Sequence, residues 1–342
     1  MLETVLKELI ALALALFPVA LFLVSLIYID SFKLVSVRSV LIAVGAGFVA
    51  AFLSLGANRA LMDLLQIPDS STVSRYVAPV VEESFKTLYL LFLFRKRKIG
   101  FMVDAAIYGF GIGAGFAIVE NIFVLVWTLP DSNILLSFVR GFGTAIMHGA
   151  VTAITAIIIA SAIERKRSYQ AGAILVGLLC ATALHSLYNH FFLPPVVGTL
   201  VILAVLPLLI VVVFHLSENG TRKWLGSGLD REVELIELIA SSTFSESPTG
   251  KYLASLRDYF PAVVVADMLC LLRLRTELAV QAKGQLLMQE AGIVIGPDED
   301  LQSKLNEIDY LEKQIGATGL MALHPLFRYD SRHNWQKQLL TK

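Results

Sequence analysis

The chain has 342 residues, and its 28 Lys and Arg balance its 28 Asp and Glu, so the formal net charge is zero. Hydrophobic residues make up 56% of the chain, charged residues only 16%, and the mean hydropathy is +0.71. This is the composition of a membrane protein rather than of a soluble globular domain, so we expect contact with a lipid bilayer and no nucleic-acid partner.

Apolar runs of about 20 residues, enough to cross about 30 Å of hydrocarbon, recur through the first two thirds of the chain. The first run follows Glu3, Lys7 and Glu8 instead of a basic cluster and is too long for a signal-peptide core, so we interpret it as a retained helix. About seven runs are candidate spans: Leu9–Ile29, Leu34–Leu55, Val73–Phe94, Phe101–Thr128, Leu136–Ile163, Ala171–Phe192 and Val196–Leu216. The predicted fold class is all-α, a polytopic transmembrane helical bundle.

Positive charges predict the orientation of these spans, because Lys and Arg concentrate on the cytoplasmic side of a membrane. Arg95–Lys98 follows the third span, Arg165–Arg167 follows the fifth, and Arg222–Lys223 follows the seventh. The turns after the fourth and sixth spans carry neither Lys nor Arg. We therefore expect a multi-pass protein of the plasma (inner) membrane with its N-terminus outside and its C-terminal part in the cytoplasm.

The composition changes after the last apolar run. Residues 217–230, SENGTRKWLGSGLD, have the Gly and Ser content of a linker, and residues 231–342 have an ordinary soluble composition. The predicted organisation is a transmembrane domain over 1–216, then the linker, then a cytoplasmic helical domain. We expect that last domain to stabilise the protein or to dock a cytoplasmic partner.

Helical periodicity predicts three amphipathic helices in the C-terminal domain. They begin with KYLASL from Lys251, then cover Ala262–Leu287, and finally Leu301–Ile315. Gly296-Pro297-Asp298 is a start signal for the third of these helices.

Several ionisable and amide side chains lie inside the predicted spans, where a charged group at a helix centre costs about 2.5 to 3.5 kcal/mol on insertion scales. They are Glu82, Glu83, Lys86, Glu120, Asn121, His148, His185 and Asn189. With the orientation predicted from the positive charges, one acidic or imidazole group on each of four helices falls about 10 to 18 Å below the outer helix end. A shared depth predicts a single polar cavity that opens outward.

Helical spacing also gathers these groups. Residues four apart lie on one helix face, and this spacing joins Glu82 with Lys86, Phe116 with Glu120, and His185 with Asn189. Neighbouring Glu82 and Glu83 differ by about 100° around their helix, so we expect one to face the centre and the other to reach a neighbouring helix or Lys86.

Four glycines, at positions 109, 111, 113 and 115, alternate along the fourth predicted span. Their pattern is similar to a dinucleotide-binding loop, but no strand precedes them. In a membrane helix, small residues allow neighbouring helices to approach closely. We therefore expect these glycines to bring the helix of Glu120 against its neighbours.

Carboxylates, imidazoles and an amide in one wet pocket are the groups that peptide hydrolysis requires. A glutamate can act as general base on a water, a histidine can orient that water or the carbonyl, and an Asn amide can donate to the oxyanion. Glutamate and histidine also bind zinc, and Glu120, His148 and His185 are the candidate ligands. Because the sequence lacks HExxH, it leaves metal dependence open.

Two other interpretations use the same residues. A proton- or ion-coupled transporter also carries buried Glu, Lys and His, but it predicts polar residues through the inner half of the membrane and paired broken helices. The inner halves of spans four to six are mostly apolar. A membrane scaffold without catalysis, which docks partners through the C-terminal domain, is the third interpretation.

The ordered motif set resembles that of the PrsW family of intramembrane proteases, which implies that residues 1–216 are a protease-like domain with its core at 73–192. The set comprises EESFK at 82–86, FAIVEN at 116–121, a helical His148 and HSLYN at 185–189. That family is related to the type II CAAX prenyl endopeptidases of the ABI family, whose pattern is EExxxR, FxxxH and HxxxN. Lys86, one position nearer than the CAAX-type Arg, and Glu120 in place of His both favour PrsW.

The resemblance implies an intramembrane endopeptidase that makes a site-1 cut in a single-pass membrane protein, such as an anti-sigma factor, near the outer face. Carried over by position, Glu82 or Glu83 would activate water, and Asn189 would steady the oxyanion. Glu120, His148 and His185 would complete the centre, with or without zinc. The supporting residues would be Lys86, Phe116 and Asn121.

Overall fold

The computed structural model describes residues 2–30, 35–96, 98–128, 134–165, 170–291, 293 and 300–327. Within these residues the regular secondary structure is helical throughout, which confirms the predicted all-α class. The chain divides into two compact units, Met1–Glu218 and Asn219–Lys342, each with its own hydrophobic core.

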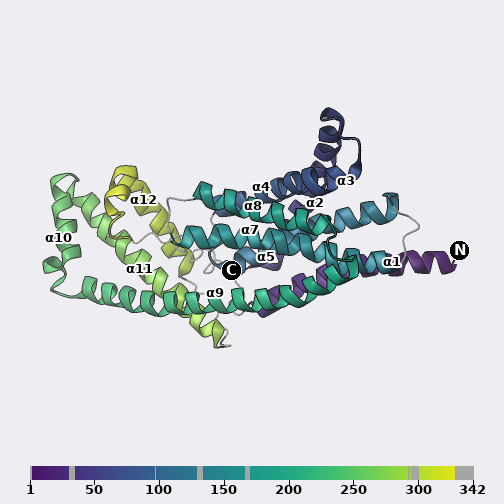
Figure 1. Ribbon diagram of the computed structural model, residues 1–342. Helices are drawn as coiled ribbons and strands as arrows, with labels where there is room; N and C mark the ends of the chain where they lie inside the picture. The colour runs from purple at the N-terminus through teal and green to yellow at the C-terminus, as the bar shows by residue number, and fades with distance from the viewer. Residues whose placement is uncertain are drawn as a thin grey trace. The chain divides into compact units, whose positions relative to one another are not determined.

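The first unit is a bundle of long helices, several of which lie alongside one another (Figure 1). Three short π-helical segments, η1 to η3, are continuous with the α-helices beside them. In chain order the elements are α1 (Leu2–Ile29), α2 (Val37–Leu64), α3 (Ser70–Thr72), η1 (Val73–Val77), α4 (Ala78–Arg95), α5 (Met102–Phe123), η2 (Val124–Thr128), α6 (Ile134–Phe138), η3 (Val139–Ala145), α7 (Ile146–Arg165), α8 (Gln170–Asn189) and α9 (Pro195–Ala240).

Six helical stretches of the described chain are long and apolar enough to cross a membrane. They are Glu8–Ile29, Val37–Leu64, Met102–Trp127, Ile134–Ile163, Ala171–Asn189 and Pro195–Gly220. Each corresponds to a predicted span, which confirms a polytopic helical membrane bundle. The remaining predicted span, Val73–Phe94, forms η1 and α4 and is less apolar because α4 carries Glu82, Glu83, Lys86 and Arg95.

Two stretches differ from the sequence expectation. α2 continues past Leu55 to Leu64, because polar residues such as Arg59 and Asp63 lower the hydropathy without breaking the helix, and these two form an ion pair of 3.3 Å. The expected linker, residues 217–230, is instead helical and forms part of α9. Its scattered glycines each cost about 1 kcal/mol in a helix interior, which weakens a helix but does not end it. The domain limits themselves stay a prediction.

α5 is the central helix of the first unit. Asp104 fixes its start, since its Oδ2 accepts hydrogen bonds from the backbone N–H of Gly100 at 3.0 Å and of Phe101 at 3.1 Å. Every side chain from Val103 to Ala117 is buried, as expected for a helix that is surrounded by others.

Glycines let α5 approach its neighbours at backbone distance. A Cβ atom added at Gly113 would collide with the backbone carbonyl oxygen of His148 in α7, and one at Gly109 would lie 2.7 Å from the Cα of Ala153. Gly115 makes the same kind of approach to α2. The expected role in close helix packing is confirmed for Gly109, Gly113 and Gly115, whereas Gly111 makes only ordinary contacts.

The second unit combines the end of α9 with the C-terminal helices. Its further elements are η4 (Phe244–Glu246), α10 (Pro248–Ser255), η5 (Leu256–Asp258), α11 (Ala262–Glu290) and α12 (Leu301–Leu323). Leucines of α11 and α12 form its core, and Tyr252 donates a hydrogen bond to the carbonyl oxygen of Ala322 at 2.6 Å. The three predicted helices are present, whereas Gly296-Pro297-Asp298 lies outside the described residues.

Gly113→Ala should destabilise the protein by about 1 to 3 kcal/mol, the usual effect of overpacking a full core, because its methyl group must push α5 away from α7. Gly111→Ala is the matched control in the same helix, since its methyl group would meet Val40 Cγ1 at 3.6 Å, an ordinary contact. Thermal unfolding in detergent micelles measures both variants. Equal melting temperatures would contradict the close approach at Gly113.

Candidate active site

α4 carries a buried ion pair. Glu83 and Lys86 are three residues apart and therefore lie on one helix face. The Lys86 Nζ donates to the Glu83 Oε1 at 2.8 Å, and the two side chains are 0% and 1% exposed. Charges buried this deeply are tolerated only when they are paired and hydrogen-bonded, so each needs further partners from other helices.

α8 supplies His185 as the second partner of Glu83. The Nδ1 of His185 lies 2.9 Å from the Glu83 Oε1, and because an ionised carboxylate only accepts, Nδ1 carries the hydrogen. The other ring nitrogen, Nε2, lies 3.8 Å from the Glu82 Oε2, and it presents a lone pair there when the ring is neutral. The other Glu82 oxygen accepts a long hydrogen bond of 3.4 Å from Asn58 of α2.

α7 supplies His148 as the second partner of Lys86. The two nitrogens, Nζ and Nδ1, lie 2.9 Å apart, and since an ammonium has no lone pair, Nδ1 accepts and Nε2 carries the hydrogen. That Nε2 lies 2.6 Å from the Glu120 Oε2, although the contact lacks hydrogen-bond geometry. The His148 and His185 rings meet edge to face at 4.7 Å, and the Phe116 ring packs against His148 at 5.1 Å.

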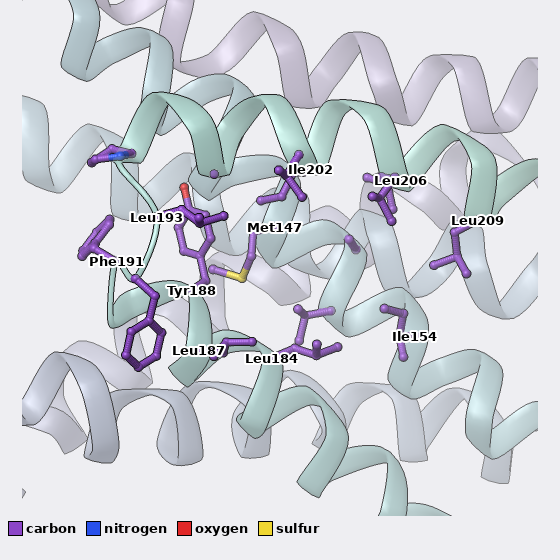
Figure 2. A pocket seen from close by; sticks show the side chains of 17 residues that line it. Met147, Ile154, Leu184, Leu187, Tyr188, Phe191, Leu193, Ile202, Leu206 and Leu209 are labelled. Carbon is purple, nitrogen blue, oxygen red and sulfur yellow. The ribbon is translucent and has the colours of Figure 1, made fainter.

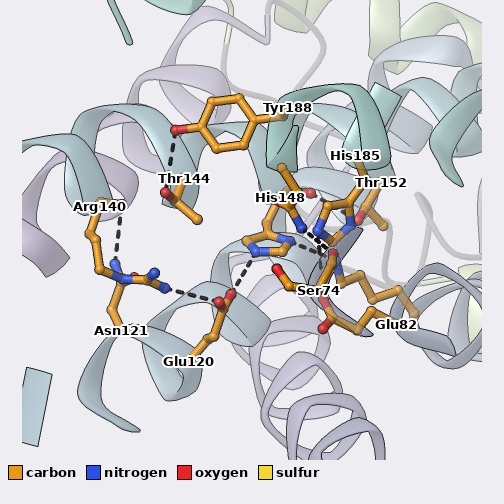
Figure 3. A network of polar contacts seen from close by, with 12 residues as sticks. Ser74, Glu82, Glu120, Asn121, Arg140, Thr144, His148, Thr152, His185 and Tyr188 are labelled. Atoms are coloured by element: carbon orange, nitrogen blue, oxygen red, sulfur yellow. Dashed lines mark hydrogen bonds and ion pairs between the residues drawn. The ribbon is translucent and has the colours of Figure 1, made fainter. Parts of the chain in front are cut away.

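η3 supplies Arg140, which holds Glu120 and Asn121 in place. Its guanidinium donates to the Glu120 Oε1 at 3.0 Å and to the Asn121 Oδ1 at 2.8 Å. The Asn121 amide donates in turn to the carbonyl oxygen of Ala15 in α1 at 2.9 Å. In Figure 3, Arg140, Asn121 and Glu120 lie on one side of His148, and Glu82 lies on the other.

The carboxylates of the cluster outnumber its permanent cations. The three carboxylates, Glu82, Glu83 and Glu120, face two permanent cations, Lys86 and Arg140. Among the described side chains, three buried atoms of the cluster have no hydrogen-bonding partner: the Glu82 Oε2, the Glu120 Oε2 and the His148 Nε2. Unpaired buried polar atoms are where an ordered water or an ion supplies the missing contact.

Glu82, His148 and His185 could hold a metal ion. Each offers one ligand atom, and these atoms all lie within 4.8 Å of one another. One carboxylate and two imidazoles are a zinc ligand set, and the hydrogen bond from His185 to Glu83 is the support that a metal-binding histidine usually has. The donor set therefore fits a metal ion, with Glu82 in the place expected for Glu120.

All but one of the predicted site residues meet in this cluster: Glu82, Glu83, Lys86, Phe116, Glu120, Asn121, His148 and His185. The exception is Asn189, which was expected to face the oxyanion. Its Nδ2 donates to the carbonyl oxygen of Ser74 at 2.9 Å and, together with Ser186, attaches α8 to η1. The catalytic roles of these residues stay predictions.

Three residues at the site were missed in the sequence. Arg140 is an arginine inside the apolar run Leu136–Ile163, so the cost of a buried charge was a signal for it. Asn58 lies beyond the predicted end of its span, and only the longer α2 brings it to Glu82. Tyr188, whose hydroxyl lies 3.3 Å from that of Thr144, gave no signal, because a tyrosine near a helix end is common in membrane proteins.

Comparison with known families gave one match. The profile of the PrsW family, described as intramembrane metalloproteases, matches residues 35–216. This range is more than half of the 342 residues and contains every ionisable residue of the cluster. Comparison with curated proteins found no match, and neither did comparison with solved structures.

Lys86→Met should destabilise the protein by about 3 to 5 kcal/mol, because it leaves the Glu83 carboxylate buried without its cation. In the double variant Glu83→Gln/Lys86→Met that charge is gone as well. The double variant should therefore lose less stability than the sum of the two single variants, as measured by unfolding in detergent micelles. Additive losses would contradict a coupled buried pair.

The exposed pair Arg59–Asp63 is the control for this double-mutant cycle. Its side chains are 75% and 64% exposed, so solvent screens the attraction between them. Arg59→Met, Asp63→Asn and the double variant should give a coupling of at most about 0.5 kcal/mol.

Proposed function

The chain belongs to the PrsW family of intramembrane metalloproteases, and we propose that it cleaves a single-pass membrane protein with a water activated between Glu82 and His185. As a member of this family with several membrane-length helices, it is an integral multi-pass membrane protease that acts on membrane-protein substrates within the bilayer.

The gap between Glu82 and His185 is the observation that supports this proposal. The Glu82 Oε2 and the His185 Nε2 lie 3.8 Å apart, and with His185 in its neutral form both present lone pairs. Two acceptors that face each other repel unless a proton, a water or a cation lies between them. A water between them would donate a hydrogen bond to each and keep an oxygen lone pair for attack on a peptide carbonyl.

Glu82 is the carboxylate best placed to act as general base, because Glu83 and Glu120 are each paired with a cation. It removes a proton from the water while the water oxygen forms a bond to the carbonyl carbon, and the carbonyl oxygen becomes the oxyanion. The protonated Glu82 then gives that proton to the amide nitrogen as the C–N bond breaks. The products are an acid and an amine, and Glu82 returns to its ionised form.

His148 is the donor that we assign to the oxyanion. Its Nε2–H lies 2.6 Å from the Glu120 Oε2 without the geometry of a hydrogen bond, so a small rotation of Glu120 would leave it to an oxyanion, and the Lys86 ammonium at Nδ1 fixes this tautomer. Asn189 suits the role less well, because its amide already donates to the carbonyl oxygen of Ser74. Arg140 acts through Glu120 and keeps that carboxylate beside His148.

Zinc is the metal that we propose for this site, held by Glu82, His148 and His185. A ligating nitrogen needs a free lone pair, so in the metal-loaded form the Lys86 ammonium would no longer donate to the His148 Nδ1. When bound, it supplies a Lewis acid that polarises a carbonyl and acidifies a water. Glu83 fixes the His185 ring in either case. Glu82 is a ligand in the metal-loaded form and the general base in a metal-free form, so metal content distinguishes the two.

The membrane side of cleavage follows from the positive charges. Arg95–Lys98 and Arg222–Lys223 favour a cytoplasmic location for the ends of their spans, which puts the N-terminus outside and the acidic and imidazole groups in the outer half. We therefore propose cleavage near the outer face of the plasma (inner) membrane, as a site-1 cut in an anti-sigma-like regulator. The C-terminal helical unit would lie in the cytoplasm and bind a partner there.

Glu82→Gln should abolish cleavage and leave the amount of protein in the membrane unchanged, because the amide keeps the size of the side chain but cannot accept the proton. The measurement compares the new termini of membrane-protein fragments in cells that carry wild type, Glu82→Gln or the exposed control Asp63→Asn. Fragments should disappear only with Glu82→Gln. Fragments that persist in that variant at equal abundance would contradict the role of Glu82.

Purified protein should contain about one zinc per chain, and His185→Ala should lower this content together with activity. His190→Ala is the matched control, because His190 follows the same helix but its Nδ1 contacts only the carbonyl oxygen of Ser186. Elemental analysis measures the metal independently of cleavage. Active protein without stoichiometric metal would exclude zinc and leave Glu82 as the base.

A further inference from the structure

An apolar groove lies between α7, α8 and α9 of the first unit (Figure 2). Its volume is about 460 Å³, within the range of ligand-binding pockets. Met147 of α7, Leu184 of α8 and Ile202 of α9 are among the side chains on its three walls, and the hydroxyl group of Tyr188 is the polar group among them. Nothing in the proposed hydrolysis uses this groove.

α9 forms one wall of the groove and is largely exposed along its apolar stretch. Only 12% of its apolar stretch Pro195–Gly220 is buried, compared with 61% of the stretch Met102–Trp127 in the bundle centre. Gly198 shows the free space directly, since a Cβ atom added there would meet no atom within 4 Å. A spanning helix that is covered so little leaves room for another apolar segment beside it.

The groove reaches the catalytic cluster through Tyr188. This residue follows His185 by three positions, and Thr144 precedes His148 by four, so each lies about one helical turn from a histidine of the cluster. The Tyr188 and Thr144 hydroxyls lie 3.3 Å apart and join α8 to η3, the segment that precedes α7, next to the contact that the two histidines make between α7 and α8 (Figure 3). A segment in the groove therefore ends next to the cluster.

We propose that this groove binds the transmembrane helix of the substrate before cleavage. The volume of about 460 Å³ suits several side chains rather than a whole helix, so one face of the substrate helix would insert its apolar side chains between α8 and α9. Helices bind grooves in this way through residues at i, i+3, i+4 and i+7, and in lipid the attraction comes from close packing. The inference rests on the proposed function.

A lipid acyl chain would also match the apolar walls. An acyl chain, however, has no peptide bond to present at the end of the groove where Tyr188 lies one helical turn from His185. The position of the groove beside the cluster therefore favours a polypeptide. Its apolar helix would bind in the groove while its scissile bond lies near Glu82.

Gly198→Phe tests the inference by filling the groove without a backbone collision. Gly172→Phe is the matched control, because Gly172 lies near the start of α8, is exposed, and has equally open space around it. The readout is the set of fragment termini that depend on Glu82 in cells. We expect these fragments to fall by at least about tenfold in Gly198→Phe, as when a binding hot spot is lost, and to stay unchanged in Gly172→Phe at equal protein abundance.

The outcomes separate the two proposals. If Glu82-dependent fragments exist and persist in Gly198→Phe, the groove does not bind the substrate, although the protease function stands. If no fragment depends on Glu82, the proposed function fails, and the substrate assignment of the groove fails with it. Loss of the fragments in both glycine variants would reveal damage to the fold and would also overturn the inference.

A photoreactive side chain at Val201, placed in the uncleaving Glu82→Gln background, gives a second readout. Val201 lines the groove, whereas Val176 of α8 is exposed outside it and serves as the control position. The Val201 probe should cross-link the same protein whose fragments depend on Glu82, and the Val176 probe should not. Adducts with lipid alone at Val201 would overturn the inference in favour of an acyl-chain site.

Discussion

The buried ion pair between Lys86 and Glu83 is the interaction on which the rest of the site depends. Neither charge is tolerable in this environment alone, since removing an ion from water costs several kcal/mol that only close partners offset. Each member of the pair also contacts one histidine, Lys86 at His148 and Glu83 at His185. One ion pair on α4 therefore fixes the tautomers of two imidazoles from two other helices, and Glu82 keeps an oxygen free for chemistry.

Close helix packing makes this arrangement possible. Gly113 brings the backbone of α5 against that of α7 at His148, so the Glu120 carboxylate on α5 reaches the imidazole. Arg140 then balances Glu120 from the π-helical segment η3, and π-helical turns are frequent at functional sites because they change which residues face inward. The polar cluster and the apolar groove share α7 and α8, so the same pair of helices would serve both the proposed chemistry and the proposed substrate binding.

Most of the bundle and of the cluster could be predicted from the sequence, because the cost of a buried charge singles out residues such as Glu82 and His148 whatever the packing. The sequence did not predict which of the two adjacent glutamates, Glu82 or Glu83, keeps an unpaired oxygen. This depends on how α4 is rotated about its axis, and helical periodicity gives only the step of about 100° between neighbouring residues. The hydropathy pattern predicted the end of the second span at Leu55, whereas α2 continues to Leu64, so Asn58 was not predicted as a residue of the site. The groove could not be predicted from the sequence, because leucines that face lipid and leucines that line a groove have the same hydropathy.

The most direct measurement is a density map of the protein in a lipid bilayer, at a resolution that shows ordered water and ions. The account predicts density for a water or a metal ion within hydrogen-bonding or coordination distance of both the Glu82 carboxylate and the His185 Nε2. It would be contradicted if these groups were separated by much more than the ~4 to 6 Å over which ionisable groups influence one another, or faced acyl chains without a shared hollow.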